Sequence, residues 1–271
     1  MSVSHEVELH RREADFHDRW ALTTPLDQIL VRECFEAPTA LENRLILAQM
    51  GPLRGKKILD IGAGLGESSV YFALQGALVT AADISPRMVE TTVKLAERHG
   101  LKIRGFVSVG EDLRLPEGEF DLVYIANTIH HVQDRSRLME QISRSLKVGG
   151  RFFSIDPIAY NPVINVYRRM ATQTRTKDES PLTVKDLRLA ERYFKNVCHR
   201  EFWLSSLLLF VKYYLLDRVH PNDDRYWKRI LKETTATLWW WLPLRSFDSV
   251  LTRVPVLRYL SWNMVMWGTK E

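Results

Sequence analysis

Apolar and polar positions follow two rhythms along the chain, and the rhythm changes near Lys57. Residues 5–20 are highly charged with amphipathic helical spacing, and residues 26–50 carry apolar side chains at mixed helical spacing. Both segments are therefore predicted to be helical. From Lys57 onward, short apolar runs predict five strands, over 57–61, 77–83, 102–108, 120–126 and 151–156.

Helical patterns fill the intervals between these strands, over about 67–75, 86–99 and 135–146. Ser85 followed by Pro86 suits the start of the second helix, and Gly149 with Gly150 is the expected end of the third. Strands that alternate with helices indicate a parallel sheet covered by helices on both faces.

The rhythm changes again after Asp156. Residues 157–180 are interpreted as an insertion with a short helix, and Thr183 can cap a helix over 184–194. Two further strands are expected, over about 196–203 and 260–270. Residues 204–258 between them are aromatic and helical in parts, so they form a second insertion.

Composition limits the setting of the protein. Formal net charge is modest, at +5, and charged residues occur throughout the chain, which gives no support to nucleic-acid binding. The longest apolar run, 202–211, is far shorter than the ~18 residues of a membrane-spanning helix. The two cysteines, Cys34 and Cys198, have no metal-ligand spacing, and the charged N-terminus is unlike a secretory signal. We expect a cytoplasmic protein, with attachment to the inner face of a membrane as the alternative.

A glycine turn follows the first predicted strand. Gly62, Gly64 and Gly66 stand where a parallel sheet binds ligands, and the next helix directs free N–H groups there. Glu67 replaces the third glycine of a dinucleotide fingerprint, and no Walker lysine follows. Because Glu67 and Asp60 would repel a pyrophosphate, the turn favours a cationic ligand group.

Asp83 ends the second predicted strand, 21 residues after Gly62. A carboxylate at this position can accept hydrogen bonds from both ribose hydroxyls. The ligand is then a nucleoside with little phosphate and a positive charge, and S-adenosylmethionine has this chemistry.

Four segments, ILDIGAGLGESS, VTAADISPRMVETT, LPEGEFDLVYIANTIHHV and LKVGGRFFSIDP, stand in order over about 55–157. They resemble the motifs of the class I S-adenosylmethionine-dependent methyltransferases. The pair His130-His131 most resembles the branch with ubiquinone and menaquinone C-methyltransferases and many natural-product enzymes. The resemblance implies a Rossmann-like α/β fold with a seven-stranded, mostly parallel sheet, helices on both faces and an aromatic helical insertion near the C-terminus.

The resemblance also implies roles for individual residues around the cofactor. The expected cofactor-binding residues are Asp60, Gly62 and Gly64 for the methionine part, Gly66 at the helix start, Asp83 for the ribose, Ile84 against the adenine, Glu111 or Asp112 near the adenine amino group, and Asn127 facing the methionine part and the acceptor. Val109-Gly110 replaces the Asp-Ala pair that is frequent in relatives. The alternative is therefore that backbone groups of residues 109–112 recognise the adenine.

Two histidines are the candidate catalytic residues. His130 or His131 could act as a general base on the acceptor, since the histidine pKa lies near neutrality. Both could equally be packing residues, because the sulfonium already activates the methyl group and alignment alone can suffice. His130, His131 and Asp134 are too local to form a convincing metal site, so no metal is expected.

The acceptor is expected to bind beside the insertion at 157–180. Tyr160, Tyr167 and Arg168 are the candidate pocket residues, and Asn161 and Arg169 lie in the same segment. The arginines either form a solvated helix face or hold an anionic group. The sequence leaves this choice open.

Tryptophan is concentrated late in the chain, with seven of eight residues at or after Trp203 and the run LWWWLPL at 238–244. Basic residues flank these stretches. Such a region can be a helical core, the lining of a large pocket, a contact with anionic lipid or a dimer interface. The pocket and the lipid contact are compatible, and either one favours a hydrophobic acceptor: a lipid, a prenylated quinone or a polyketide-like compound.

The expected organisation has four parts: an N-terminal helical cap (1–54), a cofactor-binding core (55–203), the aromatic insertion (204–258) and a final strand (259–271). The predicted function is methyl transfer in line to a hydrophobic natural-product-type metabolite. One alternative is a membrane-associated methyltransferase of a lipid or prenylated quinone, and another is a non-catalytic methyltransferase-like binding subunit. The oligomeric state is left open.

Overall fold

The computed structural model describes residues 3–176, 179–232 and 234–271, so short pieces of the predicted cap and of both insertions lie outside it. Its centre is one seven-stranded sheet in the order β3-β2-β1-β4-β5-β7-β6. The strands are β1 Lys57–Ile61, β2 Leu78–Asp83, β3 Arg104–Val107, β4 Phe120–Ala126, β5 Leu146–Pro157, β6 Lys195–Phe202 and β7 Asn263–Thr269. All pairs are parallel except those of β7 with β5 and β6. The predicted α/β fold with a mostly parallel sheet is confirmed.

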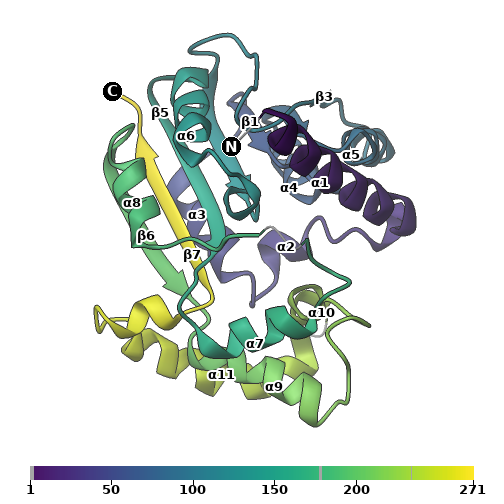
Figure 1. The fold of residues 1–271 in the computed structure, drawn as a ribbon, viewed down its shortest axis with the longest axis vertical. Coiled ribbons are helices and arrows are strands. Elements are labelled where there is room, and N and C mark those ends of the chain that lie inside the picture. Colours follow the sequence, from purple (N-terminus) through teal and green to yellow (C-terminus); the bar gives the residue numbers. More distant parts are fainter. Residues whose placement is uncertain (1–2, 177–178, 233) are drawn as a thin grey trace.

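Alternating side chains on the strands build a core on each face of the sheet. On β4, Leu122 and Tyr124 belong to one core, and Val123 and Ile125 belong to the other. Helices α3 (Leu41–Met50), α4 (Glu67–Leu74) and α5 (Pro86–Arg98) pack into the first core, and α6 (Arg135–Ser145) and α8 (Val184–Ala190) pack into the second. Figure 1 shows α6 and α8 apart from α4 and α5.

Capping residues fix where several helices begin. The Ser85 hydroxyl accepts the Met88 N–H at 3.0 Å, with Pro86 in the first turn. Thr183 and Asp186 form a reciprocal capping box at the start of α8. Both starts were predicted, and both are confirmed.

Two local predictions are wrong. Gly149 and Gly150 do not end a helix, because α6 stops at Ser145 and both glycines lie within β5, whose first residue pairs with Phe120. The segment 26–50 is not one helix. It forms a 3-10 turn at Leu26–Gln28, α2 at Glu33–Glu36 and α3, because Ala37 is extended before Pro38.

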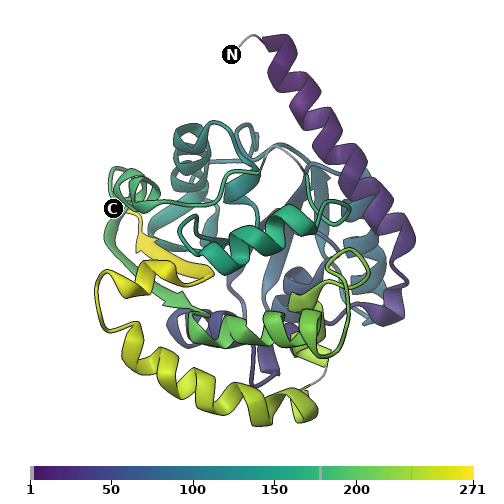
Figure 2. The same ribbon diagram turned by 60° about the horizontal axis from the view of Figure 1, so that its bottom comes forward.

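The N-terminal helix α1 (Val3–Thr23) lies against α5. The Asp18 carboxylate accepts the Ser85 hydroxyl and the Arg87 N–H, so α1 is fastened at the beginning of α5. Figure 2 shows α1 extending along the edge of the molecule.

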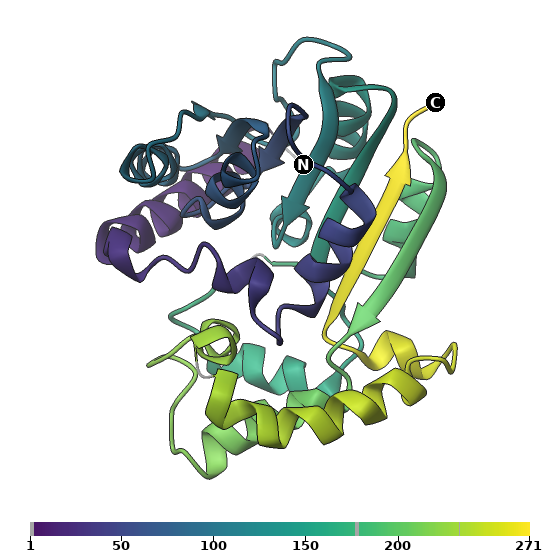
Figure 3. The same cartoon turned by 180° about the vertical axis from the view of Figure 1, so that it is seen from behind.

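Helices from the two insertions form a helical lobe: α7 (Pro162–Met170), α9 (Leu208–Leu215), α10 (Tyr226–Lys232) and α11 (Thr234–Leu251). They gather below the sheet in Figure 1, and Figure 3 shows the same lobe from behind. The segment from α9 to α11 connects β6 to β7, which is where the aromatic insertion was expected.

Candidate active site

A cavity of about 410 Å³ lies where β1, β2, β4 and β5 end, between the sheet, α1 and the lobe. Its sheet side is lined by the glycine turn, the end of β2 and the residues after β4. Its lobe side is lined by residues of α7, α10 and the start of β7. The cavity therefore joins the segment with the strongest sequence motifs to the segments with the weakest.

The glycine turn is shaped by close contacts behind it and by open space in front. Gly62 has φ +68°, and a Cβ atom there would collide with the Thr128 side chain. Gly64 has φ +57°, lines the cavity and has nothing within 4 Å of its would-be Cβ. Gly66 does not line the cavity and packs on Thr92 at the start of α4. Only Gly62 and Gly64 of the three thus face the cavity.

Asp83 is buried at the end of β2 and lines the cavity. Its two carboxylate oxygens accept the N–H groups of Gly64 and Ser85, each at 2.9 Å. Burial raises the pKa of this carboxyl group, and nearby His17 opposes the shift. Each oxygen can still accept a second hydrogen bond. Asp83 therefore holds the turn in place and also presents an acceptor to the cavity.

Asp60 is placed differently from the prediction, because it lies beneath the turn and does not line the cavity. Its Oδ2 accepts the hydroxyls of Ser68 and Ser69, each at 2.6 Å, which fastens the first turn of α4. Burial raises its pKa to about 6. Its other oxygen is buried and has no hydrogen-bond partner among the described residues.

Glu111 and Asp112 are adjacent in the chain but lie in different environments. Glu111 is buried and lines the cavity, and burial raises its pKa. Asp112 points outward and forms an ion pair with Arg114 at 2.9 Å, so the prediction that Asp112 lies near the adenine is not supported by its position. Ile84 and Asn127 both line the cavity. Asn127 has φ +51°, a conformation that costs energy for a residue with a side chain and is frequent at functional sites.

His130 forms a buried pair with Asp156 at the end of β5. The distance from Nδ1 to Oδ1 is 2.8 Å, and the His130 backbone N–H also donates to Oδ1 at 3.2 Å. Burial lowers the pKa of His130 well below its usual value and raises the pKa of Asp156 to about 8. Both groups are thus neutral near pH 7. The other ring nitrogen, Nε2, lies 3.8 Å from the Glu179 carboxylate.

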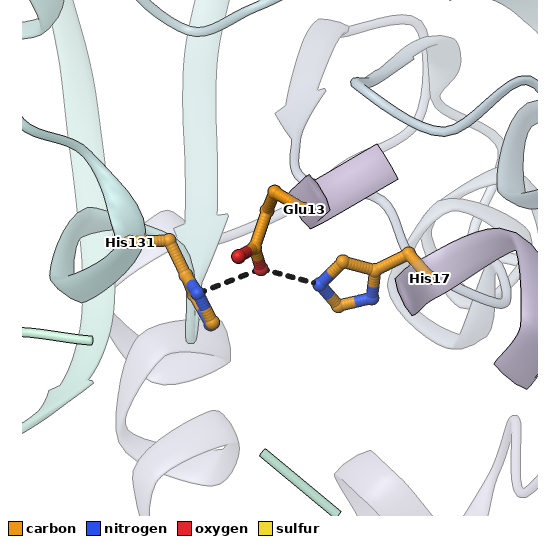
Figure 4. A group of neighbouring side chains, drawn as sticks. All are labelled: Glu13, His17 and His131. Carbon is orange, nitrogen blue, oxygen red and sulfur yellow. Dashed lines mark hydrogen bonds and ion pairs between the residues drawn. The ribbon is translucent and has the colours of Figure 1, made fainter. Parts of the chain in front are cut away.

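His131 faces α1 instead. Figure 4 shows one oxygen of Glu13 between two histidines, with 2.8 Å to His131 Nδ1 and 2.9 Å to His17 Nε2. Hydrogen bonds to these rings outweigh burial and hold the pKa of Glu13 well below its usual range. The three ligand atoms lie within 4.8 Å of one another, which is close enough for a metal ion. The same geometry is explained by an ionised carboxylate shared by two imidazoles.

Not all of the candidate acceptor residues line the cavity. Tyr167 and Arg168 line the cavity, whereas Tyr160 is 42% exposed and its hydroxyl accepts the Val184 N–H at 3.2 Å outside it. Asn161 caps α7, and Arg169 is exposed. Tyr160 is therefore not part of the cavity.

The tryptophans lie in three different environments. Trp203 and Trp241 are buried and lie 6.3 Å apart between ring centroids. Trp203, Trp227 and Trp262 line the cavity. Trp239 is 85% exposed, and Trp240 is 53% exposed. Core, pocket and surface thus each receive part of the aromatic segment.

Several cavity residues were missed in the sequence. They are His10, Glu13 and His17 on α1, Glu179 and Arg175 after α7, and Arg225 before α10. The polar face of α1 has the spacing of a solvated helix, so nothing local indicates that it covers a cavity. Asp156, the partner of His130, could have been found, because it ends a predicted strand beside the strand that precedes His130.

The fold is Rossmann-like: an open, mostly parallel sheet has a cavity at its carboxyl edge, a glycine turn after β1 and an acid at the end of β2. Residues 59–154 match the family described as "Methyltransferase domain". The chain carries a class I S-adenosylmethionine-dependent methyltransferase domain.

Two curated relatives match less than half of the chain. The 27-O-demethylrifamycin SV methyltransferase from Amycolatopsis mediterranei is 36% identical over 120 residues, 43% of this chain and 43% of that protein. A ubiquinone biosynthesis O-methyltransferase from Xylella fastidiosa is 32% identical over 103 residues, 38% of this chain and 42% of that protein. The chain thus matches less than half the length of either relative.

A solved structure shares the fold over a larger part of the chain. Phosphoethanolamine N-methyltransferase 2 from Haemonchus contortus, in complex with S-adenosyl-L-methionine, is 18% identical with a TM-score of 0.62. The match covers 95% of this chain and 59% of that one. Among the described residues, no helix is long and apolar enough to cross a membrane.

Proposed function

We propose that the protein transfers the methyl group of S-adenosylmethionine to a hydrophobic small molecule. The observation that carries this proposal is the single cavity that joins the glycine turn and Asp83 to the aromatic residues of the lobe. A donor held on the sheet side and an acceptor held on the lobe side would lie in contact. Such alignment can supply a large part of the rate enhancement.

The sheet side suits the chemistry of this cofactor. Gly64 leaves open space in the cavity, where the backbone can approach a ligand. Asp83 can accept from ribose hydroxyls, and Glu111 is the buried acid available to the adenine amino group. The unpaired Asp60 oxygen beneath the turn adds negative potential that favours a cation. When bound, the cofactor supplies an electrophilic methyl group on a positively charged sulfur.

His130 is the better candidate for a general base. Its Nδ1 is fixed by Asp156, which leaves Nε2 for the cavity, and its lowered pKa keeps the imidazole neutral at pH 7. A neutral imidazole can accept a proton from an acceptor hydroxyl or an acidic carbon. His131 donates to or shares a proton with Glu13, so its position suits it better for holding α1 over the cavity.

Calorimetry and methyl transfer test this proposal together. S-adenosylmethionine and its demethylated product should both bind, and tritiated methyl should appear in organic-soluble products when extracts of hydrophobic metabolites are supplied. Failure of both cofactor forms to bind would make the proposal wrong. Binding with no turnover on any acceptor would favour the non-catalytic subunit instead.

A second candidate, a membrane-associated methyltransferase of a lipid or prenylated quinone, is favoured by α11. On this helix, Asp248 faces the protein and several apolar side chains are exposed, although Trp241 is buried. The Asp248 carboxylate accepts the backbone N–H groups of Leu204, Ser205 and Ser206. Trp239, Phe247 and Val250 are 85%, 65% and 60% exposed.

The segment that contains α11 is basic, which suits an anionic surface. Residues 204–258 hold nine lysines and arginines against five acids, nearly all of the formal net charge of +5. Aromatic and basic side chains together suit the interface of an anionic bilayer. We therefore propose that the outward face of α11 contacts the membrane in this variant of the function.

Vesicle sedimentation tests this second candidate. The protein should sediment with phosphatidylglycerol vesicles more than with phosphatidylcholine vesicles, and Trp239→Ser with Phe247→Ser should abolish the difference. Val148→Ser is a matched control, because Val148 is 81% exposed on β5. No binding to either vesicle contradicts the candidate, and dimerisation that the double substitution abolishes would assign the face to a second copy of the chain.

A further inference from the structure

Three arginine side chains line the lobe side of the cavity. Arg168 comes from α7, Arg175 from the loop that follows it, and Arg225 from the residue before α10. Burial lowers the pKa of Arg168 to about 9 and the pKa values of Arg175 and Arg225 to about 10. Repulsion by Arg175 contributes to the shift of Arg168, so these two groups feel each other's charge.

Arg168 is only partly satisfied by the protein. Its Nη1 donates to the Asn165 side-chain oxygen at 3.0 Å and to the Ile158 carbonyl at 3.5 Å. Its Nη2 is buried, and no hydrogen-bond partner is found for it among the described residues. A guanidinium has five N–H donors in a planar fork, so a buried nitrogen without an acceptor marks a position where a ligand oxygen can bind.

The positive charges of Arg175 and Arg225 are neutralised to different extents by the protein. Arg175 forms an ion pair with Glu179. The Arg225 guanidinium lies 3.5 Å from the centroid of the Trp20 ring, which attracts a cation without neutralising it. Within the described ranges, no carboxylate oxygen lies within 4.0 Å of Arg168 or Arg225. Buried charges are unfavourable unless they are paired, so this group is incomplete without an anion.

We propose that the methyl acceptor is an amphiphile whose anionic head, a carboxylate or a phosphate, binds Arg168 together with Arg175 and Arg225. The proposal rests on the methyl-transfer function above and names the substrate class of the same cavity. The apolar body would lie against the aromatic side chains that line the lobe side. These are Tyr167, Trp203, Trp227 and Trp262. The two neighbouring arginines of α7 lie in different environments. Arg168 faces the cavity, whereas Arg169 is exposed to solvent.

Matched eight-carbon probes test the charge preference. Octanoate, octyl phosphate and octanol have the same chain and differ in the head, and calorimetry in saturating S-adenosylhomocysteine measures their Kd values. We expect at least one anionic probe to bind roughly tenfold or more tightly than octanol, because charge-assisted bonds to guanidinium groups are strong. The better of the two anions identifies a carboxylate or a phosphate head. Equal affinity for all three probes would overturn the proposal.

Arg168→Gln locates the effect, and Arg169→Gln is its control on the same helix. Arg168→Gln should weaken the preferred anion about tenfold and leave octanol unchanged, whereas Arg169→Gln should leave every Kd unchanged. If Arg168→Gln weakens S-adenosylhomocysteine and not the octyl anion, Arg168 holds the carboxylate of the donor and the proposal is wrong. In the unmodified protein, the anion preference should fall when the pH is raised from 8 to 10, which gives a test that needs no variant.

The outcomes separate this proposal from the function on which it rests. Binding of S-adenosylhomocysteine without any preference for octyl anions removes the anion site and leaves methyl transfer in place. Loss of S-adenosylhomocysteine binding in the unmodified protein removes the methyl-transfer proposal itself.

Discussion

The two sides of the cavity are built in opposite ways. The sheet side is acidic and comes from strand ends that are neighbours in one sheet, with Asp83 and Glu111 among its buried groups. The lobe side is basic and aromatic, and it comes from helices inserted after β5 and β6. In the function proposed above, one side would hold the cationic cofactor, and the other would hold an apolar acceptor with an anionic head.

This difference teaches where the specificity of such a protein is encoded. The sheet side depends on short-range spacing in the sequence. A strand followed by a glycine turn, and a second strand that ends in an acid, are enough to bring the expected binding groups to one edge of the sheet. The lobe side depends on packing between segments about 60 residues apart, such as Arg168 and Arg225. The two sides should therefore respond independently to substitution, and four experiments test this.

The largest expected effect is on the stability of the lobe. Trp241 is fully buried and packs against Trp203, which lines the cavity. Trp241→Ala should lower the free energy of unfolding by about 3–5 kcal/mol, and urea titration measures this. Trp239→Ala, at an exposed site of the same helix, should change it by less than about 0.5 kcal/mol. If the sides are independent, the Kd for S-adenosylhomocysteine stays unchanged in both folded variants.

Next in size is a change in the glycine turn. Gly62→Ala should raise the Kd for S-adenosylhomocysteine about 100-fold, roughly 3 kcal/mol, because the new Cβ would collide with Thr128 and displace the turn. Gly118→Ala controls for backbone strain, since Gly118 has φ +64° with nothing within 4 Å of its would-be Cβ. Similar cofactor affinity in the two variants would show that the contact with Thr128 does not shape the site.

Asp83→Ala should weaken S-adenosylhomocysteine by about 1–3 kcal/mol, because ribose hydroxyls lose their acceptor and Gly64 loses its tether. Calorimetry measures the change, and Asp112→Ala should have none, because that side chain is paired outside the cavity. An unchanged Kd in Asp83→Ala would reject the ribose assignment. A drop in octyl-anion binding in this variant would show that the two sides are coupled.

The smallest expected effect concerns the His130–Asp156 pair at the border of the two sides. The raised pKa of Asp156, about 8, means that the folded protein keeps a proton that the unfolded chain has lost above about pH 4. His130 has the opposite effect below about pH 6.5, where only the unfolded chain binds its proton. The two effects oppose each other between about pH 4 and 6.5, so only Asp156 contributes between about pH 6.5 and 8.

In that window, the pair should lower the free energy of unfolding as the pH rises, by up to about 2 kcal/mol in total. Asp156→Asn removes the titrating group and keeps an oxygen for the His130 Nδ1–H. The free energy of unfolding of the unmodified protein should therefore fall relative to that of this variant from pH 6.5 to 8, measured by urea titration at each pH. A constant difference would mean that Asp156 ionises normally.

The sequence predicted the sheet side well and the lobe side poorly, for physical reasons. Ser85, Asp83 and the glycine turn follow from local rules of capping and strand ends, and the structure puts them together. The prediction for Gly149 and Gly150 was wrong because glycines commonly follow helices. In the structure, Leu146 pairs with Phe120, so β5 begins before the two glycines and includes them. Glu13 and Arg225 could not be found, because a charged side chain on a helix looks solvated until its tertiary neighbours are known.

One helix touches both sides. Through Glu13, α1 reaches His131 after β4, through Asp18 it holds the start of α5 beside Asp83, and through Trp20 it meets Arg225 of the lobe. Any shift of α1 that accompanies cofactor binding is therefore felt by the group that would hold the acceptor. By linkage, if cofactor binding does shift α1, each ligand must change the affinity of the other by the same factor, so donor and acceptor would then bind cooperatively.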